Sequence, residues 1–505
     1  MRSSLRVSKS PLRYPRQIMV EAGQPKSNQL ALSLFLPGLQ ESLGASPVFF
    51  DFGPTNSLSK FKAILRQYLS PIQCLSGSGI LYIQTSLKPS SKIQAIADKY
   101  LESVETPELL EQITYRNIII GDLIYDTYLR RTNLPTIDLQ SSEYRKVLIE
   151  AISLVDYWFD YFANENVAAI CVSHCVYLGA IPARVGVNLG AQVFQVNTQS
   201  IYRVTTEFPH AYTDFVNYKE EFKKLPQEVR EAGLVSAKNR LDLRFSGQIA
   251  VDMPYSTKSA YLPESHTENA LIAKSERLKI LIAIHDFYDS PHAYGNNFYP
   301  DFYIWLNRLN ELSYEVDYDW YIKTHPDVRG PGATVLEEFI EMSNGFRLIP
   351  PETSHHDLIR SGIDCVLTVY GTIAMEYPYL ERTVVNASRN NPHVAYSFSV
   401  TPKDRSDYET IIQNLKQFCS TKINREEILE YYFMHNIQSL QSWVFRDQEK
   451  LLDEIGGYDA SNSSRIYSYF LDSFNRWEMA EYTRAIKAFL NSTEIRLGGD
   501  HFRPN

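Results

Sequence analysis

Two patterns of apolar and polar positions alternate along the chain, short apolar runs and longer amphipathic stretches. Residues 167–174 (VAAICVSH) and 191–196 (AQVFQV) are short, almost wholly apolar runs of the kind that form buried strands. Residues 177–190 lie between them and have a helical pattern that ends in glycine, and residues 143–163 place apolar side chains at three- and four-residue steps. Strands that alternate with helices in this way predict a mostly parallel sheet covered on both faces.

A second series of the same kind begins near residue 278. Its strand-like runs are LKILIAIH (278–285), DYDWYIKTH (317–325), FRLI (346–349), DCVLTVY (364–370) and TVVNAS (383–388). Helical patterns separate most of these runs, so the segment predicts a second Rossmann-like lobe even though it lacks GxGxxG. After about residue 403 the pattern becomes helical and rich in aromatic side chains.

The fold class predicted from these patterns is α/β, with two Rossmann-like lobes whose parallel sheets face a central cleft and with a helical C-terminal tail. We expect a flexible basic arm (1–27), an N-terminal lobe with a helical linker (28–270), a C-terminal lobe (271–402) and a helical C-terminal extension (403–505). A chain of 505 residues is too long for one ordinary core, which agrees with two lobes.

Charge and cysteine content narrow the class of protein. The net charge of −9 argues against a general nucleic-acid binder. Five cysteines without a paired CxxC motif are typical of reduced thiols in a cytoplasmic protein. No window of about 18 apolar residues predicts a spanning helix, but the basic residues before Glu21 could touch an anionic membrane surface. A disordered, solvated arm is the alternative interpretation of those basic residues.

Two strand ends in the C-terminal lobe carry groups suited to a nucleotide. A strand that turns through glycine into a helix presents free N–H groups and the positive end of the helix dipole to a phosphate. His325 can reach the same anion from the neighbouring strand end, and a carboxylate one helical turn past Thr372 can accept hydrogen bonds from ribose hydroxyls. The candidate nucleotide-binding residues are Lys323, His325, Pro326, Gly371, Thr372 and Glu376.

The loop that follows the first strand of this lobe is longer and more polar than a connection requires. It supplies five candidate substrate-binding residues, His285, Asp286, Ser290, His292 and Asn296. A capped surface turn is the alternative interpretation of the loop.

In the N-terminal lobe, polar residues again lie where strands are expected to end. The run NIIIGD places Asp122 at one such end, and VAAICVSH places Ser173 and His174 at another. Asp122 is the candidate catalytic carboxylate and His174 the candidate base or acceptor-binding group, although a helix N-cap would explain Asp122 equally well. Ser173 is a candidate substrate-binding residue, and Arg203 and Lys323 are cationic candidates for a carboxylate or phosphate of the donor.

The motifs KTHP, TSHHDLI, VLTVYGTIAMEYPYL and VVNAS together resemble the C-terminal half of bacterial capsule polysaccharide biosynthesis proteins. That group includes retaining β-Kdo transferases and has the two-domain GT-B architecture. The His-Pro pair and the turn with Thr372 also resemble motifs by which CMP-sugar transferases, including bacterial sialyltransferases, hold the donor nucleotide. The resemblance is best over residues 278–400 and weaker back to about residue 117.

The resemblance implies a nucleotide-sugar-dependent glycosyltransferase of the cytoplasm that acts on a surface or capsular polysaccharide or a glycolipid. The C-terminal lobe would bind the nucleotide sugar, with a CMP-linked donor such as CMP-Kdo favoured, and the N-terminal lobe the acceptor. His325, Thr372 and one helix end could neutralise a single phosphate, so no metal or other cofactor is expected to be obligatory. A UDP-sugar 2-epimerase of similar fold and a non-catalytic capsule-assembly subunit are the alternatives. Peripheral contact with the inner membrane is possible, and nucleic acid is not an expected partner.

Overall fold

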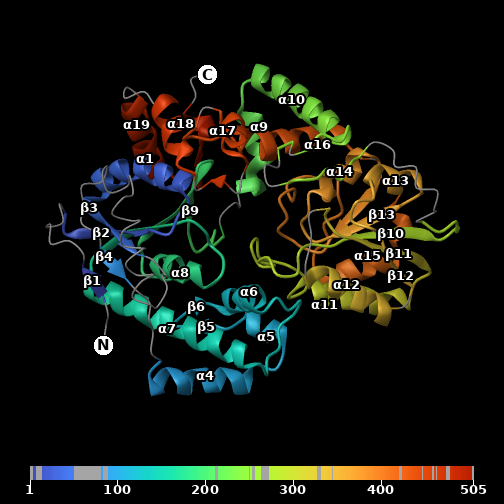
Figure 1. The fold of residues 1–505 in the computed structure, drawn as a ribbon, viewed down its shortest axis with the longest axis horizontal. Coiled ribbons are helices and arrows are strands. Elements are labelled where there is room, and N and C mark those ends of the chain that lie inside the picture. Colours follow the sequence, from blue (N-terminus) through green and yellow to red (C-terminus); the bar gives the residue numbers. More distant parts are fainter. Residues whose placement is uncertain are drawn as a thin grey trace. The chain divides into compact units, whose positions relative to one another are not determined.

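The chain folds into two α/β units, each built around its own sheet (Figure 1). Unit 1 comprises Met1–Thr127, Leu139–Tyr212 and Gln438–Asn505, and unit 2 comprises Tyr128–Asp138 and Thr213–Ile437. The structure, a computed structural model, describes residues 4–6, 14–50, 81–83, 89–210, 214–249, 251–252, 256–262, 272–326, 331–343, 345–419, 423–445, 447–457, 460–461, 463–473 and 478–502.

Unit 1 has a six-stranded sheet in the order β15-β9-β8-β7-β2-β3. Its strands are β2 (Arg16–Glu21), β3 (Ala45–Phe50), β7 (Val167–Val172), β8 (Gln192–Val196), β9 (Ser200–Val204) and β15 (Arg496–Gly498). The four strands β2, β3, β7 and β8 run parallel, whereas β9 and β15 continue the sheet antiparallel. The strand order reverses between β2 and β7, because β3 lies on one side of β2 and the later strands on the other.

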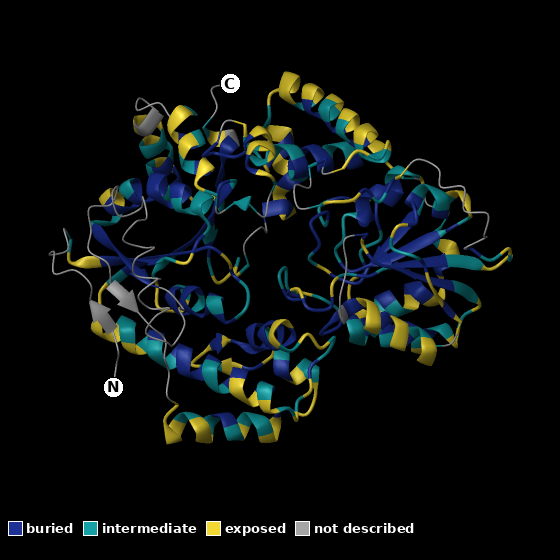
Figure 2. Cartoon of the chain, viewed as in Figure 1, coloured by how far each residue is buried: buried dark blue, intermediate teal, exposed yellow. Residues whose placement is uncertain are grey.

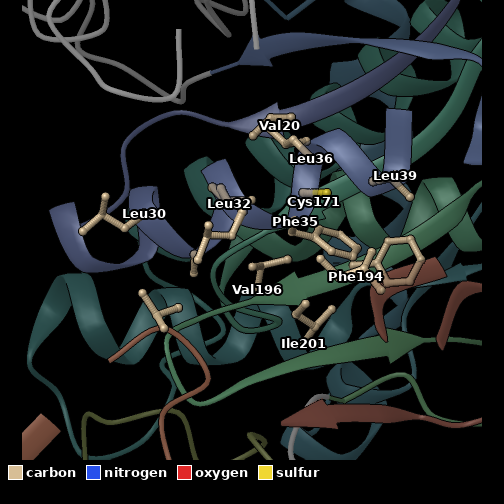
Figure 3. Close-up of a cluster of buried hydrophobic side chains, with 14 of the residues drawn as sticks. Val20, Leu30, Leu32, Phe35, Leu36, Leu39, Cys171, Phe194, Val196 and Ile201 are labelled. Atoms are coloured by element: carbon tan, nitrogen blue, oxygen red, sulfur yellow. The ribbon is translucent and has the colours of Figure 1, made fainter. Parts of the chain in front are cut away.

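Helices cover both faces of this sheet (Figure 1). They are α1 (Lys26–Leu43), α17 (Gln448–Ile455), α18 (Arg465–Ser473) and α19 (Glu478–Leu490) on one face, and α7 (Ser142–Asn164) and α8 (Ile181–Asn188) on the other. Alternation along β3 divides the side chains, since Phe49 joins the core under α1 while Phe50 packs edge-on against Trp158 of α7. Figure 3 shows the core under α1. There the Phe35 and Phe194 rings pack edge-on, with 5.2 Å between their centroids.

A small subdomain precedes α7 in unit 1. It contains α4 (Ser91–Ser103), α5 (Pro107–Glu111), the hairpin strands β5 (Thr114–Tyr115) and β6 (Ile118–Ile119), and the start of α6 (Gly121–Thr132). The prediction of a sheet strand over residues 117–122 was wrong. Arg116 and Asn117 both have positive φ, the geometry of a two-residue hairpin turn, so the apolar run is one arm of a hairpin outside the sheet. A further antiparallel pair joins β1 (Ser4–Arg6) and β4 (Leu81–Ile83).

Unit 2 has a fully parallel sheet in the order β12-β11-β10-β13-β14. The strands are β10 (Leu278–Ala283), β11 (Tyr318–Lys323), β12 (Phe346–Leu348), β13 (Cys365–Thr368) and β14 (Thr383–Asn386). All five had been predicted from their apolar runs. The order reverses between β10 and β13, as it does between the two halves of a Rossmann fold.

The faces of this sheet are also covered, as the buried strands in Figure 2 show. The helices are α11 (Phe302–Ser313), α12 (Pro331–Met342), α13 (His355–Arg360), α14 (Ile373–Tyr379) and α15 (Arg405–Gln413). Ile280 and Ile282 pack with α11, α12 and α15, while Leu281 packs with α13 and α14 on the opposite face. The prediction of two Rossmann-like α/β lobes is therefore confirmed, because each unit has its own largely parallel sheet covered by helices. The prediction of a helical C-terminal tail is confirmed as well.

The boundaries of the units differ from those expected. The expected basic arm ends before residue 16, because β2 is a buried strand of the sheet whose apolar run is only Ile18–Val20. Unit 2 takes α9 (Tyr218–Lys224) and α10 (Gln227–Phe245) from the predicted linker and α16 (Arg425–Tyr432) from the predicted extension. These helices share an aromatic core around Phe433, whereas α17 to α19 complete unit 1.

Candidate functional site

The strands of unit 2 end in one row at the carboxyl edge of the sheet. Lys323 is paired in register with Ala283, and Thr368 with Asn386. The Thr368 hydroxyl donates to the carbonyl of Ala283 at 3.3 Å, which joins the two pairs. Neighbouring strands lie about 4.8 Å apart, so the residues that follow this row are brought together.

His285 and Gly371 flank the point where the strand order reverses. This is the position at which open α/β sheets bind ligands. A side chain at residue 371 would place its Cβ 3.2 Å from His285 Cε1 and 3.0 Å from Thr368 Oγ1. Any larger residue at this position would require His285 or Thr368 to shift by a few tenths of an ångström, because the two strand ends approach so closely.

The local packing holds His285 in its neutral form. Its ring lies 4.9 Å from Phe302 and 4.6 Å from Tyr370, and burial lowers the pKa of His285 to about 4. The backbone N–H of Tyr370 donates to Nε2 at 3.4 Å, so the remaining proton of the neutral ring is on Nδ1. His285 can therefore donate a hydrogen bond from Nδ1 without carrying a charge.

Lys323 and His325 lie at the adjacent strand end. Lys323 is 2% exposed and donates to the carbonyl of Thr324 at 3.3 Å. Burial lowers the pKa of Lys323 to about 8, against the attraction of Glu352 and Glu376. His325 is exposed and Pro326 buried. Near neutral pH this strand end carries an ammonium group that can lose its proton.

Glu376 is bound by protein groups on both carboxylate oxygens. Arg244 of α10 donates to Oε1, and the Tyr261 hydroxyl donates to Oε2 at 2.7 Å. Glu376 is 3% exposed, so a ribose would have to use its remaining lone pairs. Its contact with ribose stays a prediction.

Thr372 is half-buried at the N-cap position of α14 and makes no side-chain capping bond.

The polar loop after β10 turns back over the row of strand ends. Asp286 closes a local turn by accepting from the N–H of Tyr288 at 3.1 Å. Ser290 and Asn296 have positive φ, which bends the loop, and the Asn296 carbonyl accepts from the N–H of Arg389 at 3.0 Å. His292, like Ser290, is buried. The loop thus joins the segment after β14, and its residue His285 contacts the end of β13.

In unit 1, Ser173 and His174 follow β7 at the carboxyl edge of the sheet. Sequence reasoning missed their neighbour Glu21 at the end of β2. Glu21 Oε2 accepts from the Ser173 N–H at 2.7 Å and from its hydroxyl at 2.8 Å. The sequence does hold a signal for Glu21, because an apolar run, this glutamate, a short loop and a long helix follow one another. The run is only three residues long, however, so it does not stand out as a strand.

The structure places Asp122 and Arg203 in structural contacts. Asp122 lies in the first turn of α6 rather than at the end of a sheet strand, and Arg184 of α8 donates to both of its carboxylate oxygens. The Arg203 guanidinium donates to the carbonyls of Phe489 at 2.8 Å and Glu494 at 3.2 Å, and so holds the end of α19. These contacts explain both side chains without a ligand, and their roles in catalysis and binding stay predictions.

Comparison with known proteins adds structural likenesses at low identity. No protein-family model matches the chain, and no curated protein matches it. A UDP-GlcNAc 2-epimerase from Neisseria meningitidis, solved with UDP-GlcNAc, is 10% identical, with a TM-score of 0.25 over 84% of this chain and 99% of that one. The β-Kdo 2,4-transferase KpsC from Thermosulfurimonas dismutans is 11% identical, with a TM-score of 0.31 over 55% of this chain and 85% of that one. MurG from Acinetobacter baumannii is 10% identical, with a TM-score of 0.23 over 83% and 95%.

At these sequence identities and TM-scores, the structural likenesses do not show to which protein family the chain belongs. The resemblance to capsule polysaccharide proteins therefore stays a prediction, and the site is described by its own residues. Within the described ranges, no group of three or more His, Cys, Asp and Glu side chains is arranged to hold a metal ion. Across the same part of the chain, no helix is both long and apolar enough to cross a lipid bilayer.

Proposed function

We propose that the protein is a glycosyltransferase whose nucleotide-sugar donor binds at the carboxyl edge of the unit 2 sheet. The observation that carries this proposal is the in-register row of strand ends, which brings His285 to the Tyr370–Gly371 turn where the strand order reverses. A neutral hydrogen-bond donor, a cation and a glycine turn converge on one edge of a parallel sheet. This combination suits a nucleotide phosphate.

Each group has a defined task in the proposed site. His285 would donate from Nδ1 to a phosphate or sugar oxygen, Lys323 and His325 would balance the negative charge, and the Gly371–Thr372 turn would supply N–H and hydroxyl donors. A CMP-linked donor carries a single phosphate, so these groups are sufficient in number to neutralise it. We therefore favour a CMP-linked sugar, such as a Kdo-like ulosonic acid, over a nucleotide diphosphate sugar.

The proposed acceptor is a surface or capsular polysaccharide or a glycolipid. The competing 2-epimerase would change a UDP-sugar without any acceptor and without a change of mass. Mass spectrometry of the products therefore separates the two, because transfer increases the mass of the acceptor by one sugar residue. A binding subunit without catalytic activity would give neither product.

The direct test is thermal stabilisation of the full chain by CMP, CDP, UDP and GDP. A ligand that binds only the folded state at about 100 times its Kd adds about 2.7 kcal/mol to the stability. We expect selective stabilisation by CMP, and its loss in His325→Ala and Thr372→Ala. Thr410→Ala, at an exposed position of α15, is a matched control and should respond like the wild type. Absence of stabilisation by all four nucleotides would refute the proposal, and selectivity for UDP would overturn the CMP assignment.

A further inference from the structure

Two cysteines that are distant in the chain meet at the start of strand β13 in unit 2. Cys365 is the first residue of β13, and Cys419 lies just after the short 3-10 helix η3 (Leu415–Gln417). The two thiols are hydrogen-bonded to each other. Cys365 is at the amino end of its strand, whereas the proposed donor site is at the carboxyl edge of the sheet. The thiol pair is therefore separate from that site.

Hydrogen bonds of the surrounding backbone and side chains hold the two cysteines together. Cys365 is paired in register with Thr383 of β14, and the Thr383 hydroxyl donates to the carbonyl of Phe418 at 3.1 Å. The N–H of Cys419 donates to the carbonyl of Leu415 at 3.2 Å. The segment that bears Cys419 is thus bound to the strand beside β13, and its own backbone is fixed.

Both side chains belong to the apolar core on one face of the unit 2 sheet. Cys365 is 0% exposed and packs in the core with side chains of α11, α12 and α15. Cys419 packs against the same core but is only half-buried, so a small molecule in solution can reach its sulfur. The pair thus has an inner thiol and an outer thiol. Because they are already in contact, little movement is needed to join them.

The hydrogen bond between the thiols gives each sulfur a different reactivity. This bond and burial both raise the pKa of Cys365, whereas the same bond lowers the pKa of Cys419. Cys365 is thus the donor and Cys419 the acceptor, which carries more thiolate. The proton of Cys365 has a further acceptor in the Val366 carbonyl, at 3.8 Å. Since the thiolate is the form that reacts with oxidants, Cys419 should react first and Cys365 should follow.

Cys171 in unit 1 provides a comparison within the same chain. It is 0% exposed on β7, and burial raises the pKa of its thiol. Solution therefore does not reach its sulfur, and the unreactive thiol form is favoured. A difference between Cys171 and Cys419 in reaction with an oxidant separates the effect of the thiol pair from that of cysteine content alone.

We infer that Cys365 and Cys419 form a reversible redox-modification site, at which hydrogen peroxide oxidises the two thiols to a disulfide. The Cys419 thiolate attacks one peroxide oxygen, the O–O bond breaks, and the released hydroxide takes up the proton that Cys419 had lost to solvent. The Cys365 sulfur then attacks the sulfenic acid at Cys419. The S–S bond forms, the S–O bond breaks, and the leaving hydroxide takes the Cys365 proton. Two thiols and one peroxide thus give one disulfide and two water molecules, as two electrons pass from sulfur to oxygen.

Peptide mapping of the full-length protein tests the site directly. The folded chain is treated with hydrogen peroxide, the remaining thiols are alkylated, and the protein is cut with trypsin. We expect peptides 361–382 and 417–422 to appear joined, lighter by two hydrogen atoms than the two thiol peptides together. Dithiothreitol should separate them, because a dithiol reduces the disulfide by exchange. Peptides that stay unlinked while Cys171 is oxidised overturn the inference, and so does an equal yield of peptides linked through Cys171.

Single variants test the role of each sulfur. In Cys365→Ser the sulfenic acid at Cys419 has no thiol beside it, so dimedone should label Cys419 more than in the wild type. In Cys419→Ser, Cys365 should stay a thiol. Cys171→Ala is the matched control, and it should form the link as the wild type does. Equal dimedone labelling in Cys365→Ser and the wild type overturns the inference, as does oxidation of Cys365 at the wild-type rate in Cys419→Ser. If Cys365→Ser fails to fold, Cys419→Ser and the wild-type peptide map still decide.

Thermal unfolding gives an independent measurement. A disulfide between two segments that already touch restricts the unfolded chain without displacing the folded one. Oxidation should therefore raise the melting temperature of unit 2 by about 5–10 °C. Cys419→Ser treated with the same peroxide shows the effect of oxidation at other side chains, and its melting temperature should not rise. An oxidised wild type that melts at or below the temperature of the reduced protein overturns the inference, because the link would then require β13 and η3 to move.

Discussion

Replacing Arg244 by alanine removes one of the two partners that hold the buried Glu376 carboxylate. The side chains are 13% and 4% exposed for Arg244 and Glu376, and the Tyr261 hydroxyl is the second partner. Breaking a buried ion pair from one side costs about 3–5 kcal/mol, because an uncompensated charge stays in the interior. We expect the free energy of unfolding of unit 2 to fall by that amount. Urea unfolding, monitored with a spectroscopic probe placed within unit 2, measures it.

A second substitution should restore part of the stability that Arg244→Ala loses. Glu376→Gln in the Arg244→Ala background removes the stranded charge and keeps an acceptor for Tyr261, so the double variant should be more stable than Arg244→Ala alone. Lys238→Ala is the matched control on the same helix. Its ion pair with Asp242 is about half exposed on each side, so no measurable change is expected. A double variant that is less stable than Arg244→Ala would refute the account.

Three further outcomes are expected. Because the pKa of His285 in the folded chain is about 4 and its ordinary value is 6.5, the unfolded chain binds that proton more readily, so stability present above pH 6.5 is lost as the pH falls toward 4. The loss is on the order of 3 kcal/mol in urea unfolding, and an equally steep loss in His285→Gln would contradict it. A hydrogen bond with Cys365 lowers the pKa of Cys419, and burial raises the pKa of Cys171, so a thiol reagent should modify Cys419 before Cys171 in the native protein. Mass mapping that shows Cys171 reacting first would refute this. Arg203→Ala should speed amide exchange in α19 by an amount equivalent to about 1–3 kcal/mol, and unchanged exchange would remove its anchoring role.

The sequence predicted unit 2 well because its strands are buried on both faces. A strand of this kind is an apolar run bounded by polar residues, and Leu278–Ala283 and Cys365–Thr368 both have that form. The same criterion failed where the run was short. Ile18–Val20 follows a basic stretch and is too brief to indicate a central strand, and the run after Asn117 belongs to a hairpin set by two positive φ angles.

The candidate site was predicted only as far as local order allows. His285, Lys323 and Thr372 could be proposed as ligands because they follow, end or start elements that the pattern predicts. The contacts that hold Glu376 and Ser173 could not be predicted, because contacts that join distant parts of the chain leave no local pattern. Arg244 lies 132 residues from Glu376, and Glu21 lies 152 residues from Ser173. In each case the fold supplies the neighbour that decides what the side chain can do.

The closure of unit 1 by its C-terminal strand has a consequence for synthesis on the ribosome. Strand β15 adds to the sheet beside β9, and Arg203 bonds to a carbonyl 291 residues further along the chain. The segments of unit 2 all precede residue 438, so it can fold while unit 1 still lacks α17 to α19. Until those helices emerge, the side of α1 that packs against α18 and α19 has no cover, and the nascent chain needs protection from aggregation at that side. Release of the chain directly after residue 437 should therefore give a folded second unit attached to an aggregation-prone first one.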